Sequence, residues 1–169
     1  MAVIKQKDQR VGIFIDTQNL YHTAKNLYKR KVNFANVVKD LLAGRTLIRS
    51  IAYVITTENE DEKAFLSALT KAGIETKAKD LQIFYDGSKK ADWDIGLAID
   101  AVSMAPKLDA IIILSGDGDF VPLCNYLRYH HGVQIEAATF GKSASAALKE
   151  VVDEFIDLSD NPKKYLIGY

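Results

Sequence analysis

The chain has 169 residues, of which 48% are hydrophobic and 26% are charged, and this composition is typical of one soluble globular domain. Lysine plus arginine equals aspartate plus glutamate at 22 each. The overall charge therefore neither favours nor excludes a nucleic-acid partner, which would need a local basic surface. The single cysteine excludes an internal disulfide and fits a reducing compartment.

No apolar run approaches the ~20 residues that a membrane span needs, and residues 1–10 lack the apolar core of a signal peptide. We therefore expect a cytoplasmic protein without a membrane partner. We expect a single domain over residues 1–169, with its core at about 11–158 and polar tails at 1–10 and 159–169. The end of the second tail, 161–169, is expected to be flexible or packed against a partner.

Short apolar runs alternate with segments of helical periodicity along the chain, and this alternation favours strands that alternate with helices. We expect strands at 11–15, 48–56, 110–114, 133–138 and 155–158, the last at an edge. Residues 74–79 and 81–85 form either one continued strand or a hairpin that turns near Asp80. We expect helices at 19–30, 34–42, 60–72, 93–104, 120–130 and 145–152. The order predicts a three-layer α/β/α fold with a mostly parallel central sheet.

The run 110–114 consists of apolar, mostly β-branched residues, as in a central strand covered on both faces. Asp117 and Asp119 follow it, separated by Gly118. Asp16 follows the run 11–15 in the same way. Because ligands of open α/β sheets bind beyond the carboxyl ends of the strands, we expect these carboxylates to face one crevice.

A further carboxylate, Asp94, lies at the start of the helix 93–104, and a helix start near a strand exit can face the same crevice. Asp92 competes with it for the simpler role of a helix-start charge. Asp100 is about 600° of helix rotation beyond Asp94, so we do not expect both in one site. Ile95, Ala98, Ile99 and Val102 lie on one side of this helix.

Converging carboxylates repel one another unless a cation neutralises them. Oxygen ligands without nearby thiolate or imidazole favour Mg²⁺ or Mn²⁺, and such an ion can activate water for phosphodiester hydrolysis. Asn19 and Ser115 are placed to hold a scissile phosphate or a water. Lys90 and Lys142, in loops near the crevice, are the expected cations for an RNA backbone. Each aspartate also has a simpler reading as a cap or turn former.

Three motifs in order resemble the NYN domain, in particular its LabA-like branch, a relative of the PIN nuclease fold. They are Phe14-Ile15-Asp16-Thr17-Gln18-Asn19-Leu20, the segment from Asp94 to Asp100, and Ile113 to Leu123 with its Ser-Gly-Asp-Gly-Asp core. The resemblance implies a Rossmann-like parallel sheet in 3-2-1-4-5 order and a metal-dependent ribonuclease acting on single-stranded RNA. It implies an acidic cluster of Asp16, Asp94, Asp117 and Asp119 with Asn19 beside it.

Asp16, Asp94 and Asp117 are the expected ligands of Mg²⁺ or Mn²⁺, and Asp119 is expected to act behind Asp117 or to cap the next helix. The family usually has Lys-Gly-X-Asp before its middle helix, whereas this chain has Ala-Asp-Trp-Asp at 91–94, with Lys90 adjacent.

Two other functions are compatible with these residues. One is a non-catalytic RNA-binding or regulatory module of the same fold. The other is a haloacid-dehalogenase-type phosphatase, which also begins with an aspartate at a strand end. That class needs a second aspartate two residues later, where this chain has Gln18. The sequence is also compatible with a homo-oligomer.

Overall fold

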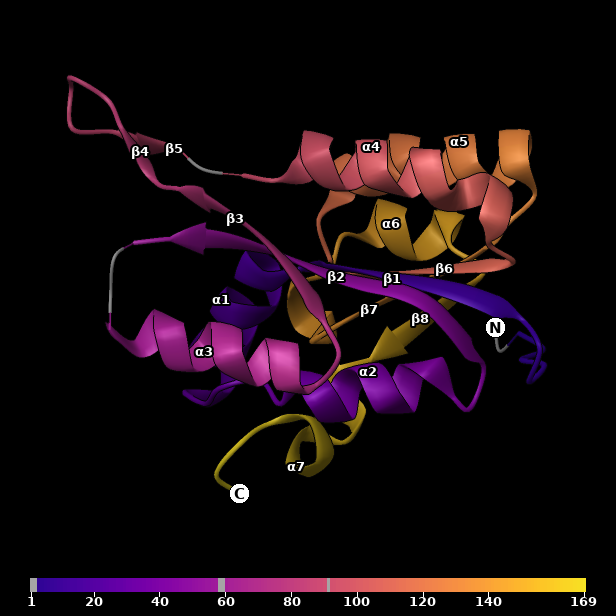
Figure 1. Cartoon of the computed structure of the whole chain (residues 1–169), viewed down its shortest axis with the longest axis horizontal. Coiled ribbons are helices and arrows are strands. Elements are labelled where there is room, and N and C mark those ends of the chain that lie inside the picture. The colour runs from indigo at the N-terminus through magenta and orange to yellow at the C-terminus, as the bar shows by residue number, and fades with distance from the viewer. Residues whose placement is uncertain (1–2, 58–59, 91) are drawn as a thin grey trace.

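Six parallel strands form the central sheet of the computed structural model, which describes residues 3–57, 60–90 and 92–169 (Figure 1). The strands lie in the order β3-β2-β1-β6-β7-β8, and every neighbouring pair is parallel. Numbered within the sheet, this order is 3-2-1-4-5-6, so the expected α/β fold and strand order are confirmed, with β8 added at the edge. Their bounds are β1 (Arg10–Asp16), β2 (Thr46–Thr56), β3 (Glu75–Asp80), β6 (Ala110–Leu114), β7 (Gln134–Thr139) and β8 (Glu154–Asp157).

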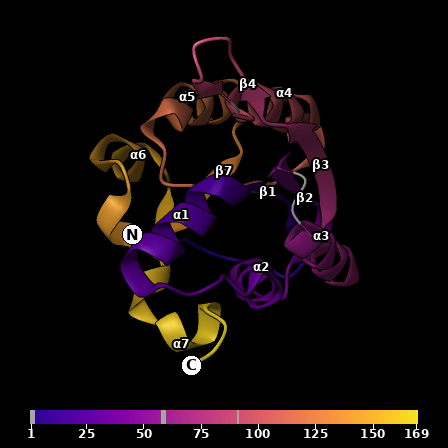
Figure 2. The same ribbon diagram turned by 90° about the vertical axis from the view of Figure 1, so that its left-hand side faces the viewer.

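Helices cover both faces of the sheet (Figures 1 and 2). One face carries α1 (Thr17–Tyr28), α2 (Phe34–Leu42), α3 (Glu60–Lys71) and α7 (Pro162–Tyr165). The other face carries α4 (Asp94–Met104), α5 (Val121–His131) and α6 (Ala146–Val151). Because β1 and β6 are covered on both sides, Val11, Ile13–Ile15 and all of β6 have no exposed surface. This explains why both strands read as continuous apolar runs.

The helix α4 faces the core with Leu97 and Ala101, which it buries against the sheet. On its other side Ile95 and Ile99 are 75% and 59% exposed. Because α4 has an apolar stripe on each of two sides, helical periodicity alone cannot choose between them.

The segment after β3 contains a separate antiparallel hairpin of β4 (Gln82–Ile83) and β5 (Lys89–Lys90). Leu81 still donates its N–H to Thr56 of β2, so the chain continues straight past Asp80. The alternative of a turn near Asp80 is wrong, because the hairpin instead turns at Asp86, whose carboxylate accepts the N–H of Ser88.

The C-terminal segment, which was expected to be flexible or packed on a partner, packs against this chain. Tyr165 and Leu166 are 6% and 4% exposed and belong to the core beside α2. Leu166 forms an antiparallel bridge with Val32, and Asn33 donates its N–H to the carbonyl of Tyr165. Among the helices in the described part of the chain, none is long and apolar enough to cross a membrane.

Candidate metal centre

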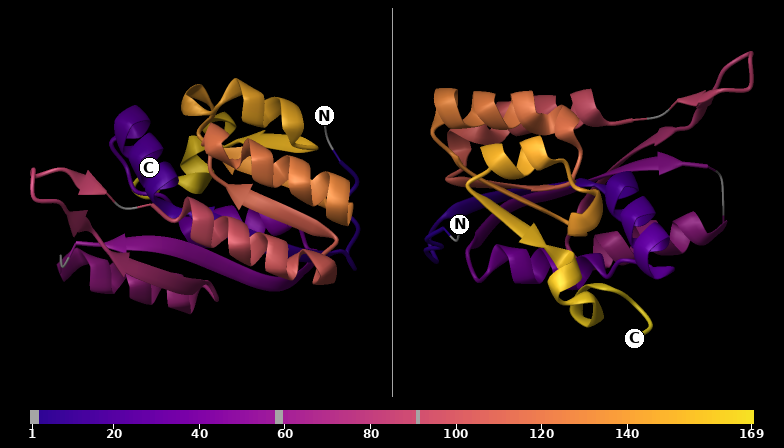
Figure 3. Two further views of the ribbon diagram at one scale, coloured as in Figure 1. Left: turned by 90° about the horizontal axis from the view of Figure 1, so that it is seen from above. Right: turned by 180° about the vertical axis from the view of Figure 1, so that it is seen from behind.

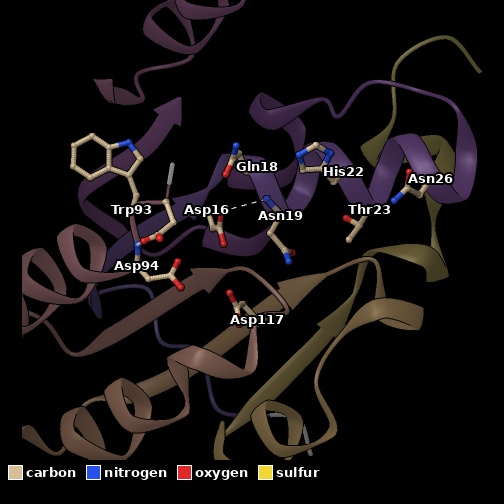
Figure 4. Close-up of a pocket in the computed structure, with 10 residues that line it drawn as sticks. Asp16, Gln18, Asn19, His22, Thr23, Asn26, Trp93, Asp94 and Asp117 are labelled. Atoms are coloured by element: carbon tan, nitrogen blue, oxygen red, sulfur yellow. Dashed lines mark hydrogen bonds between the residues drawn. The ribbon is translucent and has the colours of Figure 1, made fainter. Parts of the chain in front are cut away.

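Three aspartates converge at the carboxyl edge of the sheet (Figure 4). Asp16 ends β1, Asp117 lies just beyond β6, and Asp94 is the first residue of α4. β1 and β6 are paired neighbours that end together, with Ile15 opposite Leu114. One carboxylate oxygen of each aspartate lies within 4.8 Å of the other two. The structure thus brings together the three residues that the sequence nominated as metal ligands.

Ser115 connects two of these carboxylates. Its hydroxyl donates to Oδ2 of Asp16 at 2.9 Å and accepts the backbone N–H of Asp117 at 3.1 Å. The side chain has no exposed surface, so the expected contact with a phosphate or a water is wrong for this residue. Ser115 instead positions Asp16 and the loop that carries Asp117.

Asn19, on α1, forms hydrogen bonds that hold the same loop in place. Its Oδ1 accepts the N–H of Gly116 at 3.0 Å and the hydroxyl of Thr139 at 3.1 Å, while its own N–H donates to Oδ1 of Asp16 at 3.2 Å. A Cβ on Gly116 would lie 3.0 Å from the Cα of Ala144, so only glycine permits this approach. Asn19 therefore has a structural task, and it also lines the cavity described below.

The electrostatics of the cluster are unfavourable without a cation. Burial, and then the neighbouring charges of Asp117 and Asp16, raise the pKa of Asp94 to about 6. Burial also raises the pKa of Asp16, against the hydrogen bonds from Asn19 and Ser115. Among the ion pairs in the described ranges, none includes Asp16, Asp94 or Asp117. Three converging carboxylates, with raised pKa values at Asp16 and Asp94 and no paired cation among the described residues, fit a hard divalent ion such as Mg²⁺ or Mn²⁺.

The remaining acidic candidates lie outside this group of three. Asp119 is exposed, and its N–H donates to Oδ1 of Asp117, so it stabilises the loop behind that ligand. Asp92 is also exposed and accepts the N–H of Asp94 at the start of α4. Asp100 faces elsewhere and binds the Lys77 ammonium and the Tyr53 hydroxyl, each at 2.7 Å.

A cavity of about 270 Å³ opens from the acidic cluster along α1. Gln18, His22 and Asn26 line it at intervals of four residues, so they form one polar stripe on the helix, called here the α1 stripe (Figure 4). None of these three residues was expected in the site. The three residues are spaced four apart on the helix that follows Asp16, and this spacing in the sequence could have identified them.

Two lysines were predicted to contact a substrate, and the described lining of this cavity includes neither of them. Lys142 is exposed in a short 3-10 turn (Gly141–Ser143) and is absent from the cavity lining. The backbone of Lys90 belongs to β5, but its side chain lies outside the described part of the structure. Trp93 does line the cavity, with its indole N–H donating to the carbonyl of Val54.

The NYN domain, a known protein family, matches residues 10–159 of this chain. The chain belongs to the NYN domain family. This NYN protein is 28% identical over 165 residues to the low amplitude and bright protein LabA of Synechococcus elongatus, covering 91% of this chain and 86% of LabA. It is also similar to the crystal structure of VPA0982, a protein of unknown function from Vibrio parahaemolyticus. That likeness has a TM-score of 0.87 and 25% identity, over 98% of this chain and 100% of VPA0982.

These findings confirm the LabA-like NYN resemblance, and NYN domains are related to PIN nucleases. The matched residues include all three aspartates of the cluster.

Proposed function

We propose that this NYN protein is a metal-dependent ribonuclease that hydrolyses phosphodiester bonds of single-stranded RNA. The observation that carries the proposal is the convergence of Asp16, Asp94 and Asp117 without a cation partner, at the carboxyl edge of a parallel sheet. Ligand sites of open α/β folds lie at this edge. Membership of a PIN-like family supports nuclease chemistry at this position.

The three carboxylates are the proposed ligands of Mg²⁺ or Mn²⁺. Such an ion, when bound, supplies an activated water and stabilises the leaving oxygen of the phosphodiester. Two side chains of types that act as nucleophiles in other enzymes are unsuited to attack here. Ser115 is fully buried, and burial raises the pKa of the Cys124 thiol to about 12. The proposed nucleophile is therefore a water that the metal ion activates.

The cavity beside the cluster favours a single strand as the substrate. A volume of about 270 Å³ is of the order of one nucleotide, and an unpaired strand can turn one nucleotide into it. The α1 stripe offers amide and imidazole groups that can hydrogen-bond to a base, a ribose or a phosphate. Asn19 lines the same cavity and is the proposed contact nearest the scissile bond. Lys90 and Lys142 remain proposed contacts to the RNA backbone outside the cavity.

The test is cleavage of labelled single-stranded RNA by the purified protein in Mn²⁺, with chelator as the blank. We expect Asp117→Asn to lower the rate about 100-fold or more, because losing a ligand costs more than losing a residue that merely supports one. Asp8→Asn removes an exposed aspartate before β1, at the opposite end of the sheet, and serves as the matched control against contaminating ribonuclease.

Other outcomes would overturn the proposal. If the wild type binds RNA but is inert on varied sequences, the protein is a regulatory module. If it releases phosphate from small phosphomonoesters and Asp16→Asn abolishes this, it is a phosphatase. Equal cleavage by wild type, Asp117→Asn and Asp8→Asn would assign the activity to a contaminant.

A further inference from the structure

An apolar hairpin extends from the body of the protein beside α4. Residues 82–90, called here the arm, project away from all three layers in every view (Figures 1 and 3). The arm exposes three consecutive large side chains, Ile83 at 68%, Phe84 at 46% and Tyr85 at 111%. Consecutive exposed apolar residues on a projecting element are unusual for a surface without a partner.

Hydrogen bonds within the arm fix the shape of its turn. Phe84 donates its N–H to the carbonyl of Ser88 at 2.7 Å, Gly87 donates to Phe84 at 2.9 Å, and Asp86 accepts the hydroxyl of Ser88. These bonds give a turn of fixed shape, yet an isolated two-stranded hairpin is only marginally stable in water. A binding partner that covers the apolar side chains would supply the missing stabilisation.

A second uncovered apolar surface lies on α4. Ile95 and Ile99 lie about one turn apart on the same side of the helix and form one stripe, called here the α4 stripe, whereas Val102, further along that side, packs against the core. Ile95 and Ile99 are 75% and 59% exposed. This apolar spacing is typical of a helix side that faces the core. In α4, however, Leu97 and Ala101 on the other side of the helix face the core.

We propose that a second copy of this chain covers both surfaces, with the arm of each copy packed on the α4 stripe of the other. The two surfaces are complementary in chemistry and lie on the same chain, so a two-fold arrangement makes the same contact twice. In the views of Figures 1 and 3 the arm points away from α4 of its own chain. The chain has no net charge, so long-range repulsion between copies is small.

The exposed area is sufficient for a stable dimer. The five most exposed members are Ile83, Phe84, Tyr85, Ile95 and Ile99. Taking roughly 200 Å² for a fully exposed large side chain, their exposed surface amounts to about 700 Å² per chain. A standard protein–protein interface takes about 800 Å² from each partner, and backbone and rim residues would supply the difference.

The composition of these surfaces favours a protein partner over nucleic acid. Single-stranded RNA is bound by aromatic faces on which bases stack, together with cations along the backbone. Phe84 and Tyr85 could serve in that way, and the arm also carries Lys89 and Lys90, of which Lys90 is a proposed RNA contact. Ile83 and the isoleucines of the α4 stripe, by contrast, offer neither π-face nor charge. A second copy covers all of them. This proposal does not depend on the ribonuclease function.

Sedimentation velocity over a range of micromolar concentrations tests the proposal. We expect a dimer, and we expect Ile99→Lys and Tyr85→Ser each to raise its dissociation constant about 30-fold or more, as removal of a central interface side chain does. Ile4→Lys is the matched control, because Ile4 is also exposed, at 76%. Circular dichroism and thermal unfolding of each variant separate a lost interface from a lost fold.

Disulfide trapping identifies the contact itself. The chain holds one other cysteine, Cys124, and it is buried, so the background is low. A mixture of Tyr85→Cys and Ile99→Cys chains should form a crosslinked heterodimer, whereas Tyr85→Cys mixed with Ile4→Cys should not. A wild type that stays monomeric, or a dimer unaffected by Ile99→Lys and Tyr85→Ser, would overturn the proposal. A monomer whose RNA affinity falls in Tyr85→Ser alone would assign the arm to nucleic acid instead.

Discussion

The hydroxyl of Ser115 donates a hydrogen bond of 2.9 Å to Oδ2 of Asp16, across the boundary between β6 and β1. The hydroxyl oxygen of Ser115 also accepts the N–H of Asp117, so one buried hydroxyl sets the relative position of two proposed metal ligands. Groups that orient a ligand without touching the metal typically contribute 10–100-fold to metal affinity.

We therefore predict that Ser115→Ala lowers Mn²⁺ affinity about 10–100-fold, although no ligand is removed. Calorimetric titration with Mn²⁺ measures the affinity directly. Ser50→Ala is the matched control, because Ser50 is a buried serine whose hydroxyl has no hydrogen-bond partner. Unchanged affinity in Ser115→Ala would show that the backbone alone positions Asp16.

The raised pKa of Asp94 makes a prediction about stability. Because this pKa is about 6 in the folded protein against an ordinary value of 3.8, the folded state binds the proton more tightly than the unfolded state. The contribution of Asp94 to stability is then present at low pH and is lost as pH rises from about 4 to 6. At neutral pH without metal, Asp94→Asn should raise the melting temperature by about 1–3 °C.

The same variant should lose the stabilisation that Mn²⁺ gives to the wild type, since ligand binding to the native state raises its stability. Thermal unfolding with chelator and with Mn²⁺ gives both values. Asp8→Asn should follow the wild type in both. A destabilised Asp94→Asn protein at neutral pH would mean that the Asp94 carboxylate has a favourable partner, contrary to this account.

The α1 stripe is predicted to bind substrate and not metal. The double variant His22→Ala, Asn26→Ala should weaken binding of single-stranded RNA about 5–20-fold, the effect of losing two hydrogen bonds. Its affinity for Mn²⁺ should be unchanged. His130→Ala, which changes an exposed histidine on α5, is the control. Equal RNA affinity in the double variant and the wild type would exclude the α1 stripe as the substrate path.

A buried ion pair beneath α2 provides a test of stability away from the site. Arg45 and Glu136 have no exposed side-chain surface and form two hydrogen bonds of 2.7 and 2.9 Å. Arg45→Met leaves the Glu136 carboxylate buried beside the Gln134 amide, at 3.1 Å, and the Lys5 ammonium, at 3.8 Å. We predict a loss of about 3 kcal/mol in the free energy of unfolding.

Arg10→Met, which breaks the exposed pair with Asp109, should cost less than about 1 kcal/mol. Chemical denaturation of both variants makes the comparison. Similar losses in the two variants would show that Glu136 is well solvated or fully compensated by Lys5.

Strands that are buried on both faces could be predicted from the sequence. β6 is apolar along its whole length, and β1 has no polar side chain between Arg10 and Asp16, so the ends of these strands, and with them Asp16 and Asp117, could be placed near one another. Asp94 could be predicted as a site residue because the turn before α4 marks where that helix starts. The parallel order of the sheet then brings these three residues to one edge.

Features set by tertiary packing could not be predicted in this way. α4 carries two apolar stripes, and only its position on the sheet decides that Leu97 is inside and Ile99 outside. The burial of Ser115 depends on loops packed over it, including the close approach of Gly116 to Ala144. The cavity along α1 exists because Trp93 and Asp94 face that helix from another segment.

The central claim is that Asp16, Asp94 and Asp117 hold one divalent ion. Anomalous diffraction from a crystal soaked in Mn²⁺ tests it most directly. The account predicts a manganese peak contacted by a carboxylate oxygen of each of the three aspartates, and its loss in crystals of Asp117→Asn. Carboxylates that point apart with no peak between them, or a peak bound elsewhere on the protein, would contradict it.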